Sequence, residues 1–196
     1  FRSGGNHTVT ALVCDDARLT DQVDWSVTAR AVNWARWEYA SGGAIPDGAD
    51  IEAGTTAYLA VDGVGFSTGA SFGAWVRETD GGDGDPVEHR TLTYDSGLGR
   101  WRAPWVTEWM DDGLTDLDGY PDYIFVVDTY GTRSQGEMDV KDTVGPAWGR
   151  GTQTAGMTAD GWVLTWPVAT DGSYGSGLGE YKVYVDDDPA FGSPEV

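Results

Sequence analysis

Closely spaced carboxylates occur on a glycine-containing segment, where they could bind a cation. The stretch DDGLTDLDGYPD carries its acids around two glycines. Calcium takes about six to eight oxygen ligands, and Asp residues on a bent loop can supply several of them. Calcium is therefore the one candidate cofactor, with the expected ligands Asp112, Asp116, Asp118 and Asp122. The stretch lacks the ligand spacing and the terminal Glu of an EF-hand loop, so a plain turn that enters a strand explains the same residues.

Tryptophans are the second group of residues with binding chemistry. Trp34 and Trp37 lie beside Tyr39 in NWARWEYA, a segment that reads as a linker. Exposed indole rings can pack on a neighbouring protein surface or stack on a sugar ring. We expect these three residues to contact another domain or subunit. Trp101 and Trp105 lie on the same face of a strand, and we expect both in the core.

Catalytic chemistry has little support. The only histidines are His7 and His89, both in strand-like segments, and the single cysteine, Cys14, ends one of these segments. Neither a Ser–His–Asp nor a Cys–His arrangement can be assembled from these positions. The sequence therefore predicts a protein that is not an enzyme.

The charge balance excludes one class of partner. The 196 residues include 12 Lys+Arg and 32 Asp+Glu, which gives a net charge of −20. Such a chain repels a phosphate backbone, so we expect no nucleic-acid partner. Hydrophobic residues make up 40% of the chain, enough to build a core. No apolar run approaches the roughly 18 to 20 residues of a membrane span.

Alternation of apolar and polar residues is the recurring pattern, whereas helical spacing rarely persists beyond two turns. Gly, Pro, Asp, Asn or Ser separates one alternating segment from the next. The expected strands lie within residues 7–14, 22–30, 56–63, 70–78, 88–95, 99–106, 122–128, 137–142, 161–167 and 180–186. Many short strands without helices predict an all-β fold of antiparallel sandwiches.

Two stretches carry a resemblance to known families. YDSGLGRWRAPW (94–105) followed by LDGYPDYIFVVDTYGTRS (117–134) resembles the second half of bacterial and archaeal extracellular immunoglobulin-like domains. DGWVLTWPVATDGSYGSGLGEYKVYVDDDPAF (160–191) resembles strands B and C of a fibronectin type III domain. The resemblance implies tandem β-sandwich domains and places Trp101 and Trp166 in their cores. It implies no activity, because these sandwiches host unrelated functions.

A sequence pattern that occurs twice, at 4–29 and 119–142, predicts the domain organisation. Each copy has two alternating strands joined by a short turn, as in the last hairpin of a sandwich domain. We expect residues 1–31 to be the last two strands, F and G, of an immunoglobulin-like domain. Residues 32–143 would form a full immunoglobulin-like sandwich, and 144–196 the first strands of a fibronectin type III domain. The first and last domains would be incomplete and would expose unpaired edges, so a longer chain or neighbouring subunits should supply the missing strands.

The predicted function is structural and adhesive. The chain would be a segment of a secreted multi-domain cell-surface protein, such as an adhesin stalk, a surface-layer component or an extracellular filament subunit. Its expected partners are other copies of itself, neighbouring surface proteins or glycans. In that compartment the sequon at Asn6 could accept a glycan. The alternative is a spacer or carbohydrate-binding accessory module of a large secreted hydrolase.

Overall fold

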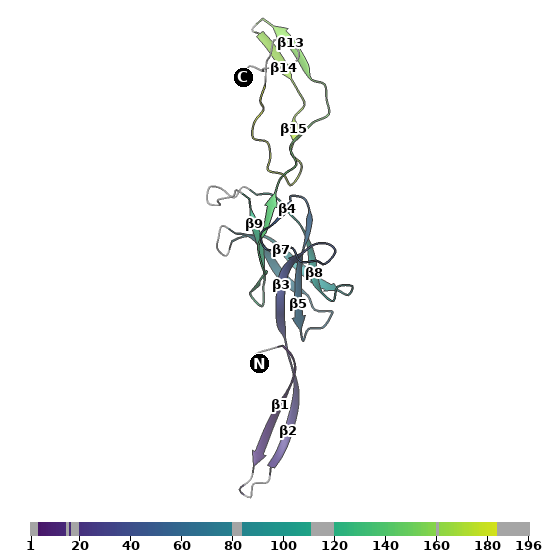
Figure 1. Ribbon diagram of the computed structural model, residues 1–196, viewed down its shortest axis with the longest axis vertical. Coiled ribbons are helices and arrows are strands. Elements are labelled where there is room, and N and C mark those ends of the chain that lie inside the picture. The colour runs from purple at the N-terminus through teal and green to yellow at the C-terminus, as the bar shows by residue number, and fades with distance from the viewer. Residues whose placement is uncertain are drawn as a thin grey trace. The chain divides into compact units, whose positions relative to one another are not determined.

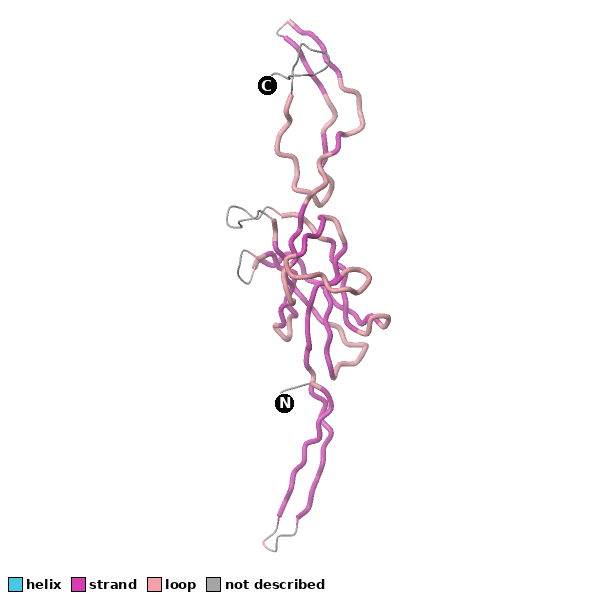
Figure 2. Tube along the Cα trace, in the orientation of Figure 1, coloured by secondary structure: helices cyan, strands magenta, loops and turns pink. Residues whose placement is uncertain are grey.

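The protein is all-β, as the alternation of its sequence predicted. In the computed structural model every regular element of the described residues is a strand, drawn in magenta in Figure 2. The described residues are 4–14, 16, 20–79, 84–110, 120–159 and 161–183. The chain divides into two compact units, Phe1–Thr143 and Val144–Val196.

The first unit begins with a long hairpin. Strands β1 (Gly5–Cys14) and β2 (Thr20–Ala29) pair antiparallel along their whole length, with Gly5 opposite Ala29 and Cys14 opposite Thr20 (Figure 1). Both ranges were expected as strands because of their period-two alternation. The base of the hairpin packs on the end of β5, where a Cβ on Gly65 would lie 2.4 Å from the Ala29 carbonyl oxygen.

The rest of this unit folds into two sheet layers joined by one shared strand. One layer contains β3 (Ala31–Glu38), β5 (Thr56–Val64) and β8 (Arg100–Val106). The other contains β6 (Phe72–Glu78), β9 (Asp122–Val127), β11 (Met138–Lys141) and β4 (Ala49–Glu52), with β10 (Thr132–Arg133) paired to β9. The long β7 (Asp85–Asp95) takes part in both, because it pairs with β6 up to Leu92 and with β8 from Thr93 onward.

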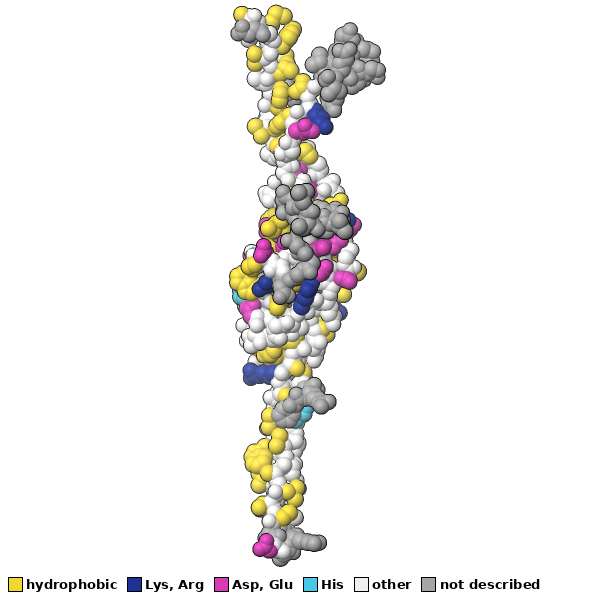
Figure 3. Space-filling model, turned by 90° about the vertical axis from the view of Figure 1, so that its left-hand side faces the viewer, with side chains coloured by type: hydrophobic (Ala, Val, Ile, Leu, Met, Phe, Trp, Pro, Cys, Tyr) yellow, Lys and Arg dark blue, Asp and Glu magenta, His cyan; other side chains and the backbone are white. Residues whose placement is uncertain are grey.

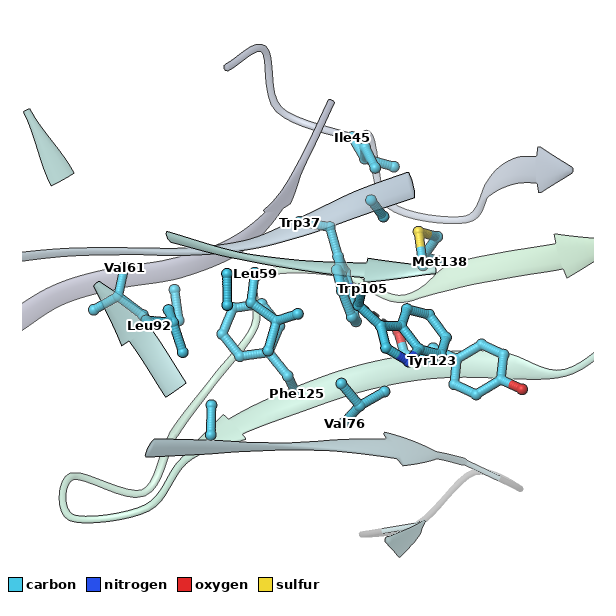
Figure 4. Packing of buried hydrophobic residues seen from close by; sticks show 14 of the residues in the cluster. Trp37, Ile45, Leu59, Val61, Val76, Leu92, Trp105, Tyr123, Phe125 and Met138 are labelled. Carbon is cyan, nitrogen blue, oxygen red and sulfur yellow. Dashed lines mark hydrogen bonds between the residues drawn. The ribbon is translucent and has the colours of Figure 1, made fainter. Parts of the chain in front are cut away.

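Aromatic side chains fill the space between the layers. The Trp37 ring lies 5.5 Å from that of Trp105, and 5.1 Å from that of Phe125 on the opposite layer (Figure 4). Trp105 also packs on Tyr123, with ring centroids 4.8 Å apart. Trp101 and Trp105 are both buried, as predicted. Each such ring removes a large apolar area from water, which makes this cluster the main source of stability for the unit.

Tyr123 ties the connection before β9 to the core. Its side chain is fully buried, and its hydroxyl donates a 2.9 Å hydrogen bond to the carbonyl oxygen of Glu108. The Tyr123 carbonyl oxygen in turn accepts a 3.0 Å hydrogen bond from Nε1 of Trp37. One residue therefore joins β3, β9 and the segment that follows β8.

The β3 edge of the first layer is covered by local backbone bonds. On the outer side of β3, the Ala35 carbonyl oxygen accepts a 2.7 Å bond from the Gln135 amide, and the Trp37 carbonyl oxygen accepts a 2.9 Å bond from the Ile45 amide. At the other end of the strand order, β4 pairs parallel with β11. Bonds of this kind occupy groups that an open edge would offer to another chain.

The second unit has two short ladders in its described part. β12 (Ala147–Trp148) pairs with β15 (Ala169–Thr170), and β13 (Thr154–Thr158) pairs with β14 (Gly161–Thr165). Trp166, which the resemblance placed in a core, is 37% exposed. That expectation is wrong for this structure, because the described residues of the unit form no second layer over the indole.

Removing the Tyr123 hydroxyl should destabilise the first unit. In Tyr123→Phe the Glu108 carbonyl oxygen loses its donor at a partly buried site, so we expect the free energy of unfolding to fall by about 1–3 kcal/mol. Urea denaturation followed by tryptophan fluorescence measures the change. The matched control is Tyr39→Phe, at an exposed position, which should change stability by less than about 0.5 kcal/mol. Equal effects of the two variants would contradict the role given to Tyr123.

Candidate functional site

The predicted aromatic surface divides between the two faces of one strand. The segment NWARWEYA is not a linker, because its first six residues belong to β3. Trp37 points into the core and is only 1% exposed, so its prediction as a contact residue is wrong. Trp34, on the opposite face, is half-buried, and Tyr39 is exposed just beyond the strand. The apolar residues at 35 and 37 were the sequence signal for this alternation.

A buried carboxylate organises the outer face of β3 and β8. Glu38 is fully buried, and Arg36, Arg100 and Arg102 surround it. Arg36 Nη2 lies 2.8 Å from Oε1, while Arg100 Nε donates to Oε2 at 3.0 Å. Arg102 Nε lies 3.1 Å from Oε2. Register brings these residues together from distant parts of the sequence, which sequence reasoning missed. The sequence signal for this cluster was the i, i+2 spacing of Arg36 with Glu38 and of Arg100 with Arg102, which places each pair on one face of a strand.

Two aromatic rings stack on these arginines. The Arg36 guanidinium lies 4.2 Å from the Trp34 ring centroid, and that of Arg102 lies 4.1 Å from the Tyr58 ring. Such cation–π contacts add to the ion pairs and hold the guanidinium planes in place. One side of the Trp34 indole is therefore used within the protein, so this face serves chiefly to lock β3, β5 and β8 together.

Asp95 extends the charged network to the turn before β8. Its carboxylate accepts hydrogen bonds from the amides of Leu98 and Gly97, and it lies 3.5 Å from Arg102 Nη1. The bond from the Leu98 amide, helped by Gly97 and Arg102, lowers the pKa of Asp95. A lowered folded-state pKa stabilises the fold above the ordinary carboxyl range, and this contribution is lost as the pH falls through the folded-state pKa.

Most of the predicted calcium ligands fall where the structure gives no description. Asp112, Asp116 and Asp118 lie outside the described residues. Asp122 begins β9, and its backbone carbonyl accepts a 2.8 Å hydrogen bond from the Thr79 amide. Within the described ranges, no three His, Cys, Asp or Glu side chains are arranged to hold a metal ion. Calcium at the acidic segment stays a prediction.

The sequon residue Asn6 lies within β1. Its side chain is exposed and accepts a 2.8 Å hydrogen bond from the Thr28 hydroxyl on the facing strand. A glycan on Asn6 would project from the polar face of the hairpin. Glycosylation stays a prediction.

The hairpin β1–β2 has one apolar face and one polar face. The apolar face carries His7, Val9, Ala11 and Val13 from β1 and Val23, Trp25, Val27 and Ala29 from β2, with Asp21 near the turn. On the polar face, Thr10 Oγ1 donates a 2.6 Å bond to Asp24. This bond, followed by the one from the Gln22 amide, lowers the pKa of Asp24. Leu12 and Cys14, which lie near the turn, are apolar exceptions on this polar face.

The apolar face of the hairpin is open to solvent. Trp25 is 50% exposed and Val13 is 66% exposed, and Figure 3 shows hydrophobic side chains in yellow along the hairpin. A lone two-stranded hairpin is marginally stable in water, and such a face is normally covered by a second sheet. The hairpin therefore resembles one sheet of a β-sandwich whose inner, apolar face is exposed.

A second uncovered apolar face lies on the ladder of β13 and β14. Met157 faces Trp162, and Ala155 faces Leu164, all on one side of the pair. Met157 is 73% exposed and Trp162 is 68% exposed. Beside them is an open cavity of about 260 Å³, lined by Trp148, Gln153, Leu164, Trp166, Tyr181, Lys182 and Val183.

Comparison with known proteins gives no further guide to the site. No protein-family model matches the sequence, and no curated protein matches it. The described residues contain no helix with the length and apolar character needed to cross a membrane.

Neutralising Glu38 should strongly destabilise the first unit. In Glu38→Gln three arginines would share a buried site without their carboxylate, so we expect the free energy of unfolding to fall by about 3–5 kcal/mol. Chemical denaturation measures the loss. The control Glu88→Gln removes an exposed ion pair with Arg90 and should cost at most about 1 kcal/mol. A loss of that small size in both variants would show that the cluster does not hold the layers together.

Proposed function

We propose that the two-layer part of the first unit is an immunoglobulin-like sandwich. Three features support this: the parallel pair of β4 with β11, the single strand β7 that serves both layers, and the buried Tyr123 whose hydroxyl bonds to an upstream carbonyl. A tyrosine at this position, near the start of the strand after a crossing connection, is typical of such domains. In the same proposal, residues 1–31 are an F–G hairpin and 144–196 are the first strands of a fibronectin type III domain.

For the whole chain we propose a structural and adhesive role as a segment of a secreted, multi-domain cell-surface protein. The chain would associate with other copies or with neighbouring surface proteins, as in a stalk, a surface layer or a filament. The single observation that carries this is the apolar face of β1–β2, where Val9, Val23 and Trp25 are all exposed. The role requires association and mechanical strength, and it involves no catalysis.

The size of this face is sufficient for association. Full burial of a Val or a larger apolar side chain contributes about 1.5–3 kcal/mol. Val9, Val13, Val23 and Trp25 are 38–66% exposed, so about half of this remains to be gained, on the order of 3–6 kcal/mol per copy and about twice that for two mated faces. This is comparable to the roughly 4–15 kcal/mol that association costs in lost motion and ordering. The β3 edge of the two-layer part is covered, as the bonds at Ala35 and Trp37 show. The hairpin is thus the better surface for assembly.

The alternative is a carbohydrate-binding or spacer module attached to a secreted hydrolase. It rests on Trp34, which is half-buried, and on Tyr39, which is exposed at the end of the same strand. Saturable polysaccharide binding that disappears in Trp34→Ala/Tyr39→Ala would favour this alternative over the structural role.

Substitutions on the two faces of the hairpin test the proposed function. Val9→Thr/Trp25→Thr keeps residues that suit a strand but removes apolar area from a facing pair. We expect the unmodified chain to associate as its concentration rises in sedimentation velocity, and this variant to remain monomeric.

The matched control exchanges Thr8 and Ser26, a facing pair on the polar face. Thr8→Ser/Ser26→Thr should associate like the unmodified chain. Association that is equal in both double variants, or an unmodified chain that stays monomeric up to its solubility limit, would contradict the proposal.

A further inference from the structure

On the outer face of β9, β6 and β7, the exposed Trp75 lies in a row of side chains of different chemical types. Strand register aligns Arg133 with Val126, Val126 with Trp75, and Trp75 with His89, so the row crosses four strands. Trp75 is 39% exposed, whereas its neighbours in β6, Ala74 and Val76, point inward and are buried. The Trp75 ring packs edge-on against that of His89, with centroids 5.0 Å apart, and the rest of the indole faces solvent.

A glycine beside Trp75 makes room for a polar pair. His89 Nε2 and Asp128 Oδ2 lie 2.7 Å apart, directly above Gly73, the second residue of β6. A Cβ at Gly73 would lie 2.3 Å from Asp128 Oδ2 and 2.9 Å from His89 Nε2. Glycine within a strand costs about 0.5–1 kcal/mol and often marks a place of close approach. Here it allows the pair to lie against the sheet at the level of the indole.

An open cavity adjoins the other side of the row. It measures about 300 Å³ and is lined by Arg77, Ile124, Val126, Gly131 and Arg133. Ile124 supplies an apolar floor, and the two arginines supply hydrogen-bond donors at the wall. The volume is at the lower end of the roughly 300–1,000 Å³ of small-molecule sites. Arg133 is paired with Glu137, so the cavity carries donors without a large excess of positive charge.

We propose that this face binds a neutral polysaccharide. A sugar ring has an apolar face of C–H groups, which suits the Trp75 indole, and a rim of hydroxyls that both donate and accept hydrogen bonds. Asp128 accepts such bonds, and His89 can exchange bonds with hydroxyls on the same side of the ring. The next ring of the chain would reach the cavity walls at Arg77 and Arg133.

The electrostatic field of the chain favours a neutral ligand at this face. The chain has a net charge of −20, so its field repels an anionic polymer over long range. The ion pair of Arg133 with Glu137 reduces the local attraction for a carboxylate or sulfate. Hydroxyl groups carry no such penalty. This inference goes beyond the proposed assembly through β1–β2, and it uses none of the same residues.

Native affinity electrophoresis of the full chain tests the proposal. The gels contain hydroxyethylcellulose, arabinoxylan or galactomannan as neutral probes, polygalacturonate as the anionic probe, and EDTA to remove calcium. We expect at least one neutral polymer to retard the unmodified chain. Trp75→Thr should weaken that binding by at least about tenfold, because the stacking surface is lost. Trp75→Phe should retain part of it.

Two controls separate this site from general effects. Tyr174→Thr removes a similarly exposed aromatic ring from the second unit and should bind like the unmodified chain. Gly73→Ala, which displaces the His89–Asp128 pair, should weaken binding while Trp75 remains in place. Retardation by none of the neutral polymers, binding confined to polygalacturonate, or equal binding by Trp75→Thr and the unmodified chain would overturn the proposal. None of these outcomes depends on whether β1–β2 mediates assembly.

Discussion

A β-sheet with an apolar face must have that face covered, and this constraint governs the whole chain. In the two-layer part, the cluster around Trp37 and Phe125 meets it, with rings from opposite layers 5.1 Å apart. The hairpin β1–β2 and the ladder β13–β14 have the same two-faced pattern, yet the described residues leave their apolar sides exposed. The same physical rule therefore explains a stable core in one place and a surface suited to association in two others.

The buried Glu38 gives the two-layer part a second kind of cohesion. Apolar packing tolerates sliding of one side chain against another, whereas a carboxylate held by three arginines from β3 and β8 requires a particular register. The stacking of Arg36 on Trp34 and of Arg102 on Tyr58 orients those arginines further. The outer face is thus ordered by charge and the inner face by apolar packing, so a sandwich with this network keeps a defined outer surface.

Alternation in the sequence was enough to predict the all-β class and the burial of Trp101 and Trp105. It was not enough to place Trp34 and Trp37 on opposite faces of β3, because NWARWEYA also reads as a linker. The cluster at Glu38 and the pair above Gly73 depend on strands that are far apart in the sequence. Their contacts arise from the registers of β3 with β5 and β5 with β8, and of β6 with β7 and β9. Those registers depend on the fold as a whole, and no local pattern encodes them.

The strong negative charge and the apolar surfaces act over different distances. Repulsion between copies that each carry −20 is long-ranged, but salt screens it beyond about 8–10 Å at 0.1–0.15 M ionic strength. Burial of Val9 or Trp25 against another sheet acts only at contact. On the outer face of β3 and β8, Arg36, Arg100 and Arg102 gather around Glu38 and Asp95, so the excess acid of the chain lies outside this cluster. The excess acid therefore discourages random encounters, while an uncovered apolar face retains its full driving force once two surfaces fit.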